Sequence, residues 1–126
     1  MTTNEIIQNL QCFIDLTLFD ATHGETINKD TLDKAAKTQV AACEEAIKLL
    51  SGASENTLAM PLKEISSTLT SLSAEFDNHI EEIKANGYAE NNPVIPLEKS
   101  NSEAFKAVAN KINTGKFKDD NIRNDR

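Results

Sequence analysis

Glu75, His79 and Glu82 have the best spacing for chemistry in this sequence. They are separated by four and then three residues, so a helix would place them along one side. Two carboxylates and an imidazole placed in this way could bind a cation or transfer a proton. Carboxylate-bridged metal sites in helical bundles need Glu-x-x-His pairs, however, and the sequence has none. The pattern therefore favours a hydrogen-bonded polar layer at His79, or a point where the helix leaves the core, over a metal site.

The remaining reactive residues give weaker signals. Cys12 and Cys43 have no CxxC spacing and no histidine at ligand spacing, which predicts two buried apolar side chains over a disulfide or a redox pair. His23 lies in a polar segment beside Gly24, where an imidazole is normally solvated. The sequence also lacks a glycine-rich phosphate loop, a GxSxG motif and an HExxH motif. We therefore expect a protein that is not an enzyme and that binds no cofactor or metal.

Length and charge exclude further classes. A chain of 126 residues is expected to form one domain. Its net charge is −7, and residues 1–28 carry four acids without any lysine or arginine. Such an acidic body repels phosphate backbones, so direct nucleic-acid binding is not expected. No stretch reaches the ~18 apolar residues of a membrane span, and the first residues do not resemble a secretory signal. The sequence therefore predicts a cytoplasmic protein away from membranes, with signal-less export as the alternative.

Helices must position these residues, because apolar residues at helical spacing recur along the chain together with capping signals. Thr2 and Glu5, for example, have the spacing of a capping box. These patterns predict an all-α fold, a small antiparallel bundle of about four helices. The helices are expected at residues 4–19, 30–51, 58–86 and 101–114. Residues 1–115 would then form a single helical domain.

Two segments are expected to lie outside the helices. Residues 88–99 contain Pro93 and Pro96 and are predicted to form a connector. Its adjacent apolar residues should strap it across the bundle, since they would otherwise be exposed. These are Val94, Ile95 and Leu97. Residues 116–126 are rich in charge and poor in apolar residues, which predicts a flexible tail.

The third predicted helix is the element around which the others are organised. Its apolar residues have the spacing of a helix that packs lengthwise against other helices. They are Leu62, Ile65, Leu69, Leu72, Phe76 and Ile83. His79 stands where the next apolar residue would fall. The serines and threonines of the first half, including Ser66 and Ser73, are expected on the solvent side.

The first predicted helix is apolar on two sides. Besides its main stripe, Cys12, Leu16 and Phe19 fall on a separate arc when residues are spaced by about 100°. Either other helices of the bundle cover this arc, or it binds another chain. Residues 14–18 also alternate like a short strand, but the residues before them fit only the helical period. We therefore expect a helix throughout.

Together these features predict a non-enzymatic protein–protein interaction module. It would act as an adaptor, chaperone, immunity-type or inhibitor protein, of phage or bacterial origin, that occupies a partner protein's surface. The candidate interface residues are Cys12, Leu16, Phe19, Glu75, His79 and Glu82. One alternative is a structural helical protein that assembles into a homo-oligomer, with His79 fixing the register. A lesser alternative is an acidic mimic of nucleic acid that blocks a DNA- or RNA-binding protein.

Overall fold

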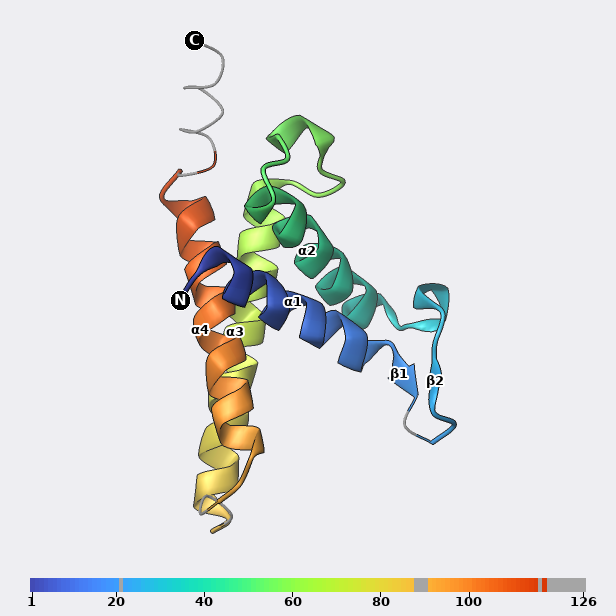
Figure 1. Ribbon diagram of the computed structural model, residues 1–126, viewed down its shortest axis with the longest axis vertical. Coiled ribbons are helices and arrows are strands. Elements are labelled where there is room, and N and C mark those ends of the chain that lie inside the picture. Colours follow the sequence, from blue (N-terminus) through green and yellow to red (C-terminus); the bar gives the residue numbers. More distant parts are fainter. Residues whose placement is uncertain (21, 88–90, 116, 118–126) are drawn as a thin grey trace.

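The computed structural model describes residues 1–20, 22–87, 91–115 and 117. These residues form the α-helices α1 (Thr3–Thr17), α2 (Lys34–Leu50), α3 (Leu62–Ala85) and α4 (Val94–Asn113). They also form two antiparallel strands, β1 (Phe19–Asp20) and β2 (Glu25–Thr26), and two 3-10 turns, η1 (Lys29–Thr31) and η2 (Glu55–Thr57). In Figure 1, α3 and α4 run antiparallel to each other, and α1 and α2 pack across their upper part. The predicted all-α helical bundle is confirmed.

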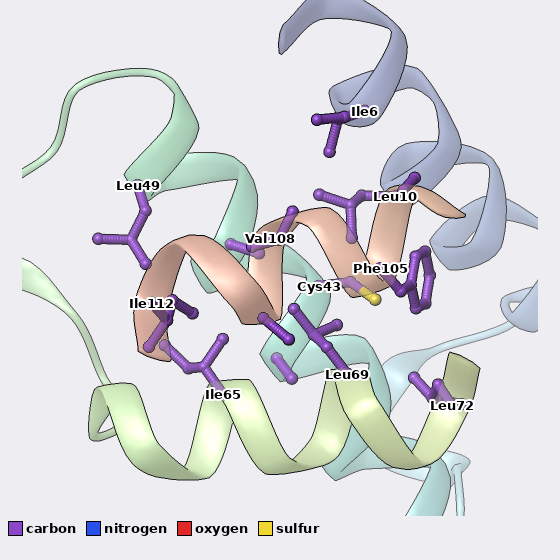
Figure 2. Packing of buried hydrophobic residues seen from close by; sticks show 14 of the residues in the cluster. Ile6, Leu10, Cys43, Leu49, Ile65, Leu69, Leu72, Phe105, Val108 and Ile112 are labelled. Atoms are coloured by element: carbon purple, nitrogen blue, oxygen red, sulfur yellow. The ribbon is translucent and has the colours of Figure 1, made fainter. Parts of the chain in front are cut away.

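The hydrophobic core lies where the four helices meet. Leu10 of α1, Cys43 of α2, Leu69 of α3 and Phe105 of α4 are each fully buried. Figure 2 shows these side chains converging on one interior. Both cysteines are free thiols, and Cys12 is only half-buried. Cys43 therefore behaves as the small buried apolar residue that its spacing predicts.

Three aromatic rings join α1, α3 and α4. Phe13, Phe76 and Phe105 pack edge to face, with ring centroids 5.6 Å apart for Phe13 and Phe105 and 5.3 Å apart for Phe76 and Phe105. Phe13 and Phe76 complete the triangle at 6.0 Å. Edge-to-face pairs add to the stability already gained from burial, so this cluster fixes where α1 crosses the α3–α4 pair.

The first helix ends earlier than predicted because a hairpin follows it. The carboxylate of Asp20 accepts hydrogen bonds from the backbone amides of Thr22 and His23, and Gly24 adopts a left-handed φ of 66°. This turn pairs Phe19 with Thr26 across the two short strands. The prediction that the helix extends to Phe19 was therefore wrong, and so was the strand alternative at residues 14–18, which are helical as far as Thr17.

The next two helices start later than predicted. The side chain of Asp33, which accepts from the Ala36 amide at 2.8 Å, caps α2. Asn28 caps η1 instead. At α3, Pro61 occupies the N-cap position in an extended conformation, which keeps the preceding residues out of the helix.

The largest error concerns the connector at residues 88–99, whose second half belongs to α4. Pro96 is the third residue of this helix, where its missing amide would have had no partner within the helix. Val94 and Leu97 are consequently exposed on the first turns of α4 and are not strapped across the bundle. The predicted start at residue 101 is wrong for the same reason. Residues 88–90 lie outside the described part of the chain.

Serines predicted to face solvent on α3 are buried against α4. Ser66 donates a hydrogen bond to the Asn113 side chain at 2.6 Å, and Ser73 bonds within its own helix. Ser102 of α4, also buried, donates to the Asp77 carboxylate at 2.7 Å. Small hydroxyl side chains let the two helices approach closely while their polar atoms remain satisfied. Ser66 and Ser73 are thus part of the helix contact, whereas Ser67, Thr70 and Ser71 are exposed, as predicted.

The end of the described chain packs back onto the bundle. Phe117 is buried in the core cluster, and the ammonium of Lys111 lies 5.1 Å above its ring. Residues 116 and 118–126 lie outside the described part, so the flexible tail expected at 116–126 and the single domain of 1–115 stay predictions.

Candidate protein-binding surface

Leu16, Met1 and Phe19 are the most exposed large apolar side chains of the described chain, and Leu16 and Phe19 lie close together in the sequence. They are 57% and 49% exposed, respectively. With three neighbours they line a groove of about 330 Å³ at the junction between α1 and the hairpin. We call it the acidic groove; its residues are Asp15, Leu16, Leu18, Phe19 and Thr26.

The junction holds these side chains in place through its backbone. The carbonyl of Leu18 accepts a hydrogen bond from the amide of Ile27 at 2.6 Å, directly beside the paired strands. Leu18 itself is half-buried against the core. One apolar residue therefore anchors the junction, while Leu16 and Phe19 on either side of it remain open to solvent.

The structure separates the predicted trio of Cys12, Leu16 and Phe19. Leu16 and Phe19 line one groove, as the interface alternative requires. Cys12 lies one helical turn before Leu16, is half-buried and does not line the groove. The sequence-based arc assumed a helix as far as Phe19, whereas β1 carries that residue. Asp15, Leu18 and Thr26 were missed because only the hairpin brings them together.

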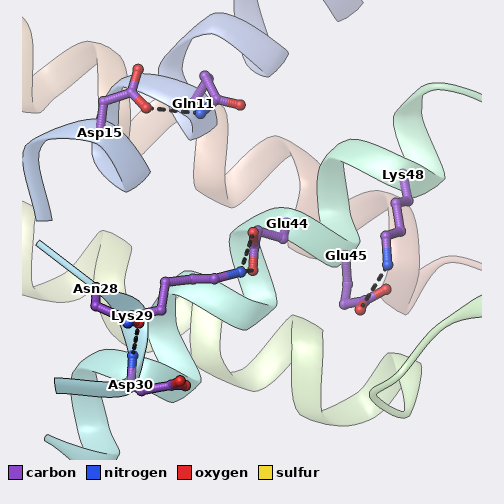
Figure 3. Close-up of polar contacts among 8 residues, drawn as sticks. All are labelled: Gln11, Asp15, Asn28, Lys29, Asp30, Glu44, Glu45 and Lys48. Atoms are coloured by element: carbon purple, nitrogen blue, oxygen red, sulfur yellow. Dashed lines mark hydrogen bonds and ion pairs between the residues drawn. The ribbon is translucent and has the colours of Figure 1, made fainter. Parts of the chain in front are cut away.

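One carboxylate, that of Asp15, lines the acidic groove, and a second, that of Asp20, follows the lining residue Phe19 in the hairpin. Asp15 accepts a hydrogen bond from the Gln11 amide at 2.9 Å, as Figure 3 shows. Asp20 accepts a bond from the His23 ring at 2.8 Å. The bond to His23, together with bonds from the Thr22 and His23 amides, holds the pKa of the Asp20 carboxyl below its ordinary value. Asp20 is therefore ionised at neutral pH.

The second predicted site, at the acidic end of α3, does not converge. Glu75 and Glu82 are exposed, and His79 instead pairs with Glu98 of α4, with Nδ1 at 2.6 Å from the carboxylate. Ile80 is only 7% exposed, so it takes the buried position on α3 that the apolar spacing assigned to His79. Within the described residues, no group of three or more His, Cys, Asp or Glu side chains is arranged to hold a metal ion.

Sequence reasoning missed Glu98 because it assigned this residue to a connector. Once α4 is known to begin at Val94, Glu98 falls on its second turn, opposite the last turns of α3. A helix start placed two residues before Pro96 would have supplied the signal. The interaction ties the free end of the α3–α4 pair together.

A second ion pair holds α3 and α4 nearer the middle. Lys106 contacts the Asp77 carboxylate at 2.7 Å, and Ser102 donates to its other oxygen. The bond from Lys106 is the main cause, and that from Ser102 a further one, of the lowered pKa of Asp77. The charges at this end of α3 are therefore partly balanced within the chain.

Two titratable side chains of α2, Cys43 and Glu45, are buried. Burial raises the pKa of the Cys43 thiol to about 12, so the nucleophilic thiolate is scarce at neutral pH. Glu45 is 4% exposed, with one carboxylate oxygen 3.3 Å from the Lys48 ammonium and the other unpaired among the described residues. Neither faces the acidic groove.

Comparisons with known proteins identify no relative: no protein-family model, curated protein or solved structure matches the chain. Among the residues that the structure describes, none of the helices combines the length and apolar character needed to cross a membrane. The functional argument therefore depends on the geometry of the surface.

Proposed function

We propose that this protein is a non-enzymatic binding module that occupies the surface of a partner protein. An apolar side chain of the partner would fill the acidic groove, and the carboxylates at its rim would select the partner by charge. Adaptors, chaperones, immunity-type proteins and inhibitors act in this way.

The exposure of Leu16 and Phe19 beside one hollow is the observation that carries the proposal. Single exposed apolar residues are ordinary on protein surfaces. A leucine and a phenylalanine that line the same groove, with carboxylates at its edge, have the composition of an interface with an apolar centre and a polar rim. The partner's contact would cover side chains that the bundle leaves in water.

Self-association is the second candidate, and a different surface favours it. Val94 and Leu97 are 37% and 44% exposed on α4, at the end of the α3–α4 pair that extends beyond α1 and α2 (Figure 1). A second copy could cover them. Light scattering at about pH 5.5 and about pH 8 tests this candidate, since a monomer at both values rules it out.

Affinity capture from the native cells with three purified baits tests the proposed function. The baits are the wild type, the double variant Leu16→Ser/Phe19→Ser and the control Val94→Ser/Leu97→Ser. The control also removes two exposed apolar side chains, so it accounts for a general loss of hydrophobic surface. Circular dichroism must first show equal helicity. Captured proteins are then purified and their binding to each bait is measured.

We expect the partner to bind the wild type and the Val94/Leu97 variant with similar affinity, and the Leu16/Phe19 variant at least tenfold more weakly, as for a pair of residues at the centre of an interface. Equal binding to all three baits, or loss only in the Val94/Leu97 variant, would show that the acidic groove is not the binding surface.

A further inference from the structure

Building on the proposed function, we infer that the acidic groove binds a basic amphipathic segment, in which lysine or arginine side chains flank an apolar anchor. The anchor would contact Leu16 and Phe19, and the cations would contact carboxylates of α1 and the hairpin. The inference rests on how charge is distributed around the groove.

The segment that forms the groove and leads into α2 is strongly acidic. Residues 15–33 contain five carboxylates and one lysine. The carboxylates belong to Asp15, Asp20, Glu25, Asp30 and Asp33. The lysine, Lys29, extends along α2 to Glu44, with Nζ 3.1 Å from its carboxylate (Figure 3). The cation nearest in sequence to the groove is thus engaged elsewhere.

Two carboxylates remain available to a partner. Among the described residues, neither Asp15 nor Glu25 forms an ion pair, and both are exposed. Glu25 also lies directly opposite Asp20 in the strand register. Like charges in such a position repel each other, since the Cβ atoms of facing residues lie about 5 Å apart. A cation bound to Glu25 would reduce this repulsion, while Asp20 keeps its bond to His23.

The same charges disfavour other occupants. A polyanion or an acidic helix would bring negative charge onto an uncompensated negative rim. A second copy that used this same face would bring two acidic patches together, because symmetric dimers bury identical patches. An uncharged apolar segment would fill the groove but leave both carboxylates unpaired. A basic amphipathic segment satisfies both parts of the surface.

Two synthetic peptides of about 18 residues, long enough to form a helix on binding, provide the probes. One carries leucine on one face and lysine on the other, and its counterpart has glutamate in place of every lysine. Fluorescence anisotropy with labelled peptide measures binding to the full-length protein. We expect the Leu/Lys peptide to bind and the Leu/Glu peptide not to bind, and we expect added salt to weaken the complex.

A matched pair of charge variants separates this site from general electrostatic attraction. Asp15→Asn/Glu25→Gln removes one charge that lines the groove and one next to the lining residue Thr26, whereas Glu81→Gln/Glu82→Gln removes two exposed charges on α3. We expect the groove variant to bind the Leu/Lys peptide about three- to tenfold more weakly and with less dependence on salt. The α3 variant should bind like the wild type, and Leu16→Ser/Phe19→Ser should abolish binding.

Three results would overturn the inference: no binding of the Leu/Lys peptide to the wild type, equal binding of the two peptides, or equal effects of the two charge variants. The proposed function is tested separately. If a native partner needs Leu16 and Phe19 but binds the Asp15/Glu25 variant with unchanged affinity, the function stands and the basic chemistry of the partner is refuted.

Discussion

A pair of leucines on α1 provides a direct test of which residues belong to the core. Leu10 is completely buried, whereas Leu16, on the same helix, is 57% exposed. Replacing each by alanine removes the same atoms. The difference between the two variants in the free energy of unfolding therefore reports the difference in burial.

The expected magnitudes differ several-fold. Leu10→Ala leaves a cavity among the four helices and should cost about 3–5 kcal/mol. Full burial of a leucine contributes roughly 1.5–3 kcal/mol, and Leu16 is less than half buried, so Leu16→Ala should cost less than about 1 kcal/mol. Alanine also forms helix slightly better than leucine, which lowers the second value further.

Urea unfolding followed by circular dichroism measures both values. The dependence of the unfolding free energy on urea should be equal in the two variants, so that the midpoints can be compared directly. A cost for Leu16→Ala equal to that of Leu10→Ala would refute the reasoning, because Leu16 would then be a core residue and the acidic groove would not be an open surface.

Two further predictions concern titratable groups. Because the pKa of Cys43 is raised to about 12, iodoacetamide at about pH 8 should alkylate Cys12 in the folded protein and Cys43 only after denaturation. Mass spectrometry measures the rate of modification at each cysteine. Modification of Cys43 as fast as that of Cys12 would contradict the burial of Cys43. Because the pKa of Asp77 is lower in the folded than in the unfolded chain, its ionisation stabilises the fold above the unfolded pKa of about 4, and this stabilisation is lost as the pH falls through the folded value. Asp77→Asn should therefore reduce the loss of stability on acidification below about pH 4, measured as the change of the urea midpoint with pH. An equal change of the midpoint with pH in variant and wild type would show that the bonds from Lys106 and Ser102 do not stabilise the charged carboxylate.

The helices could be predicted from sequence because their signals are local. Thr2 accepts a bond from the Glu5 amide, as its capping-box spacing indicates. The apolar residues of α3 are buried at Leu62, Ile65, Leu69 and Leu72. Periodicity and capping act within a few residues, so the chain around them carries enough information to identify a helix.

The errors arose where one residue type permits two structures. Pro96 ends a helix in most positions but is harmless in a first turn, and only the position of Val94 distinguishes the two cases. Ser66 and Ser73 have the composition of a solvated surface, yet a neighbouring helix can bury them once their hydroxyls find partners. Such choices depend on contacts between segments far apart in the sequence, which periodicity does not reveal.

The two surfaces predicted as interfaces differ in the apolar side chains that lie beside their charges. At the acidic end of α3, Lys106 of α4 contacts Asp77 and His79 contacts Glu98 of α4, while Glu75 and Glu82 are exposed and form no ion pair among the described residues. At the acidic groove, the described chain supplies no cation to Asp15, and the exposed Leu16 and Phe19 side chains line the same groove. A partner gains the most binding free energy where exposed apolar side chains can be buried and unpaired charges can be paired at the same place. The groove therefore has a physical reason to bind another chain that the end of α3 lacks.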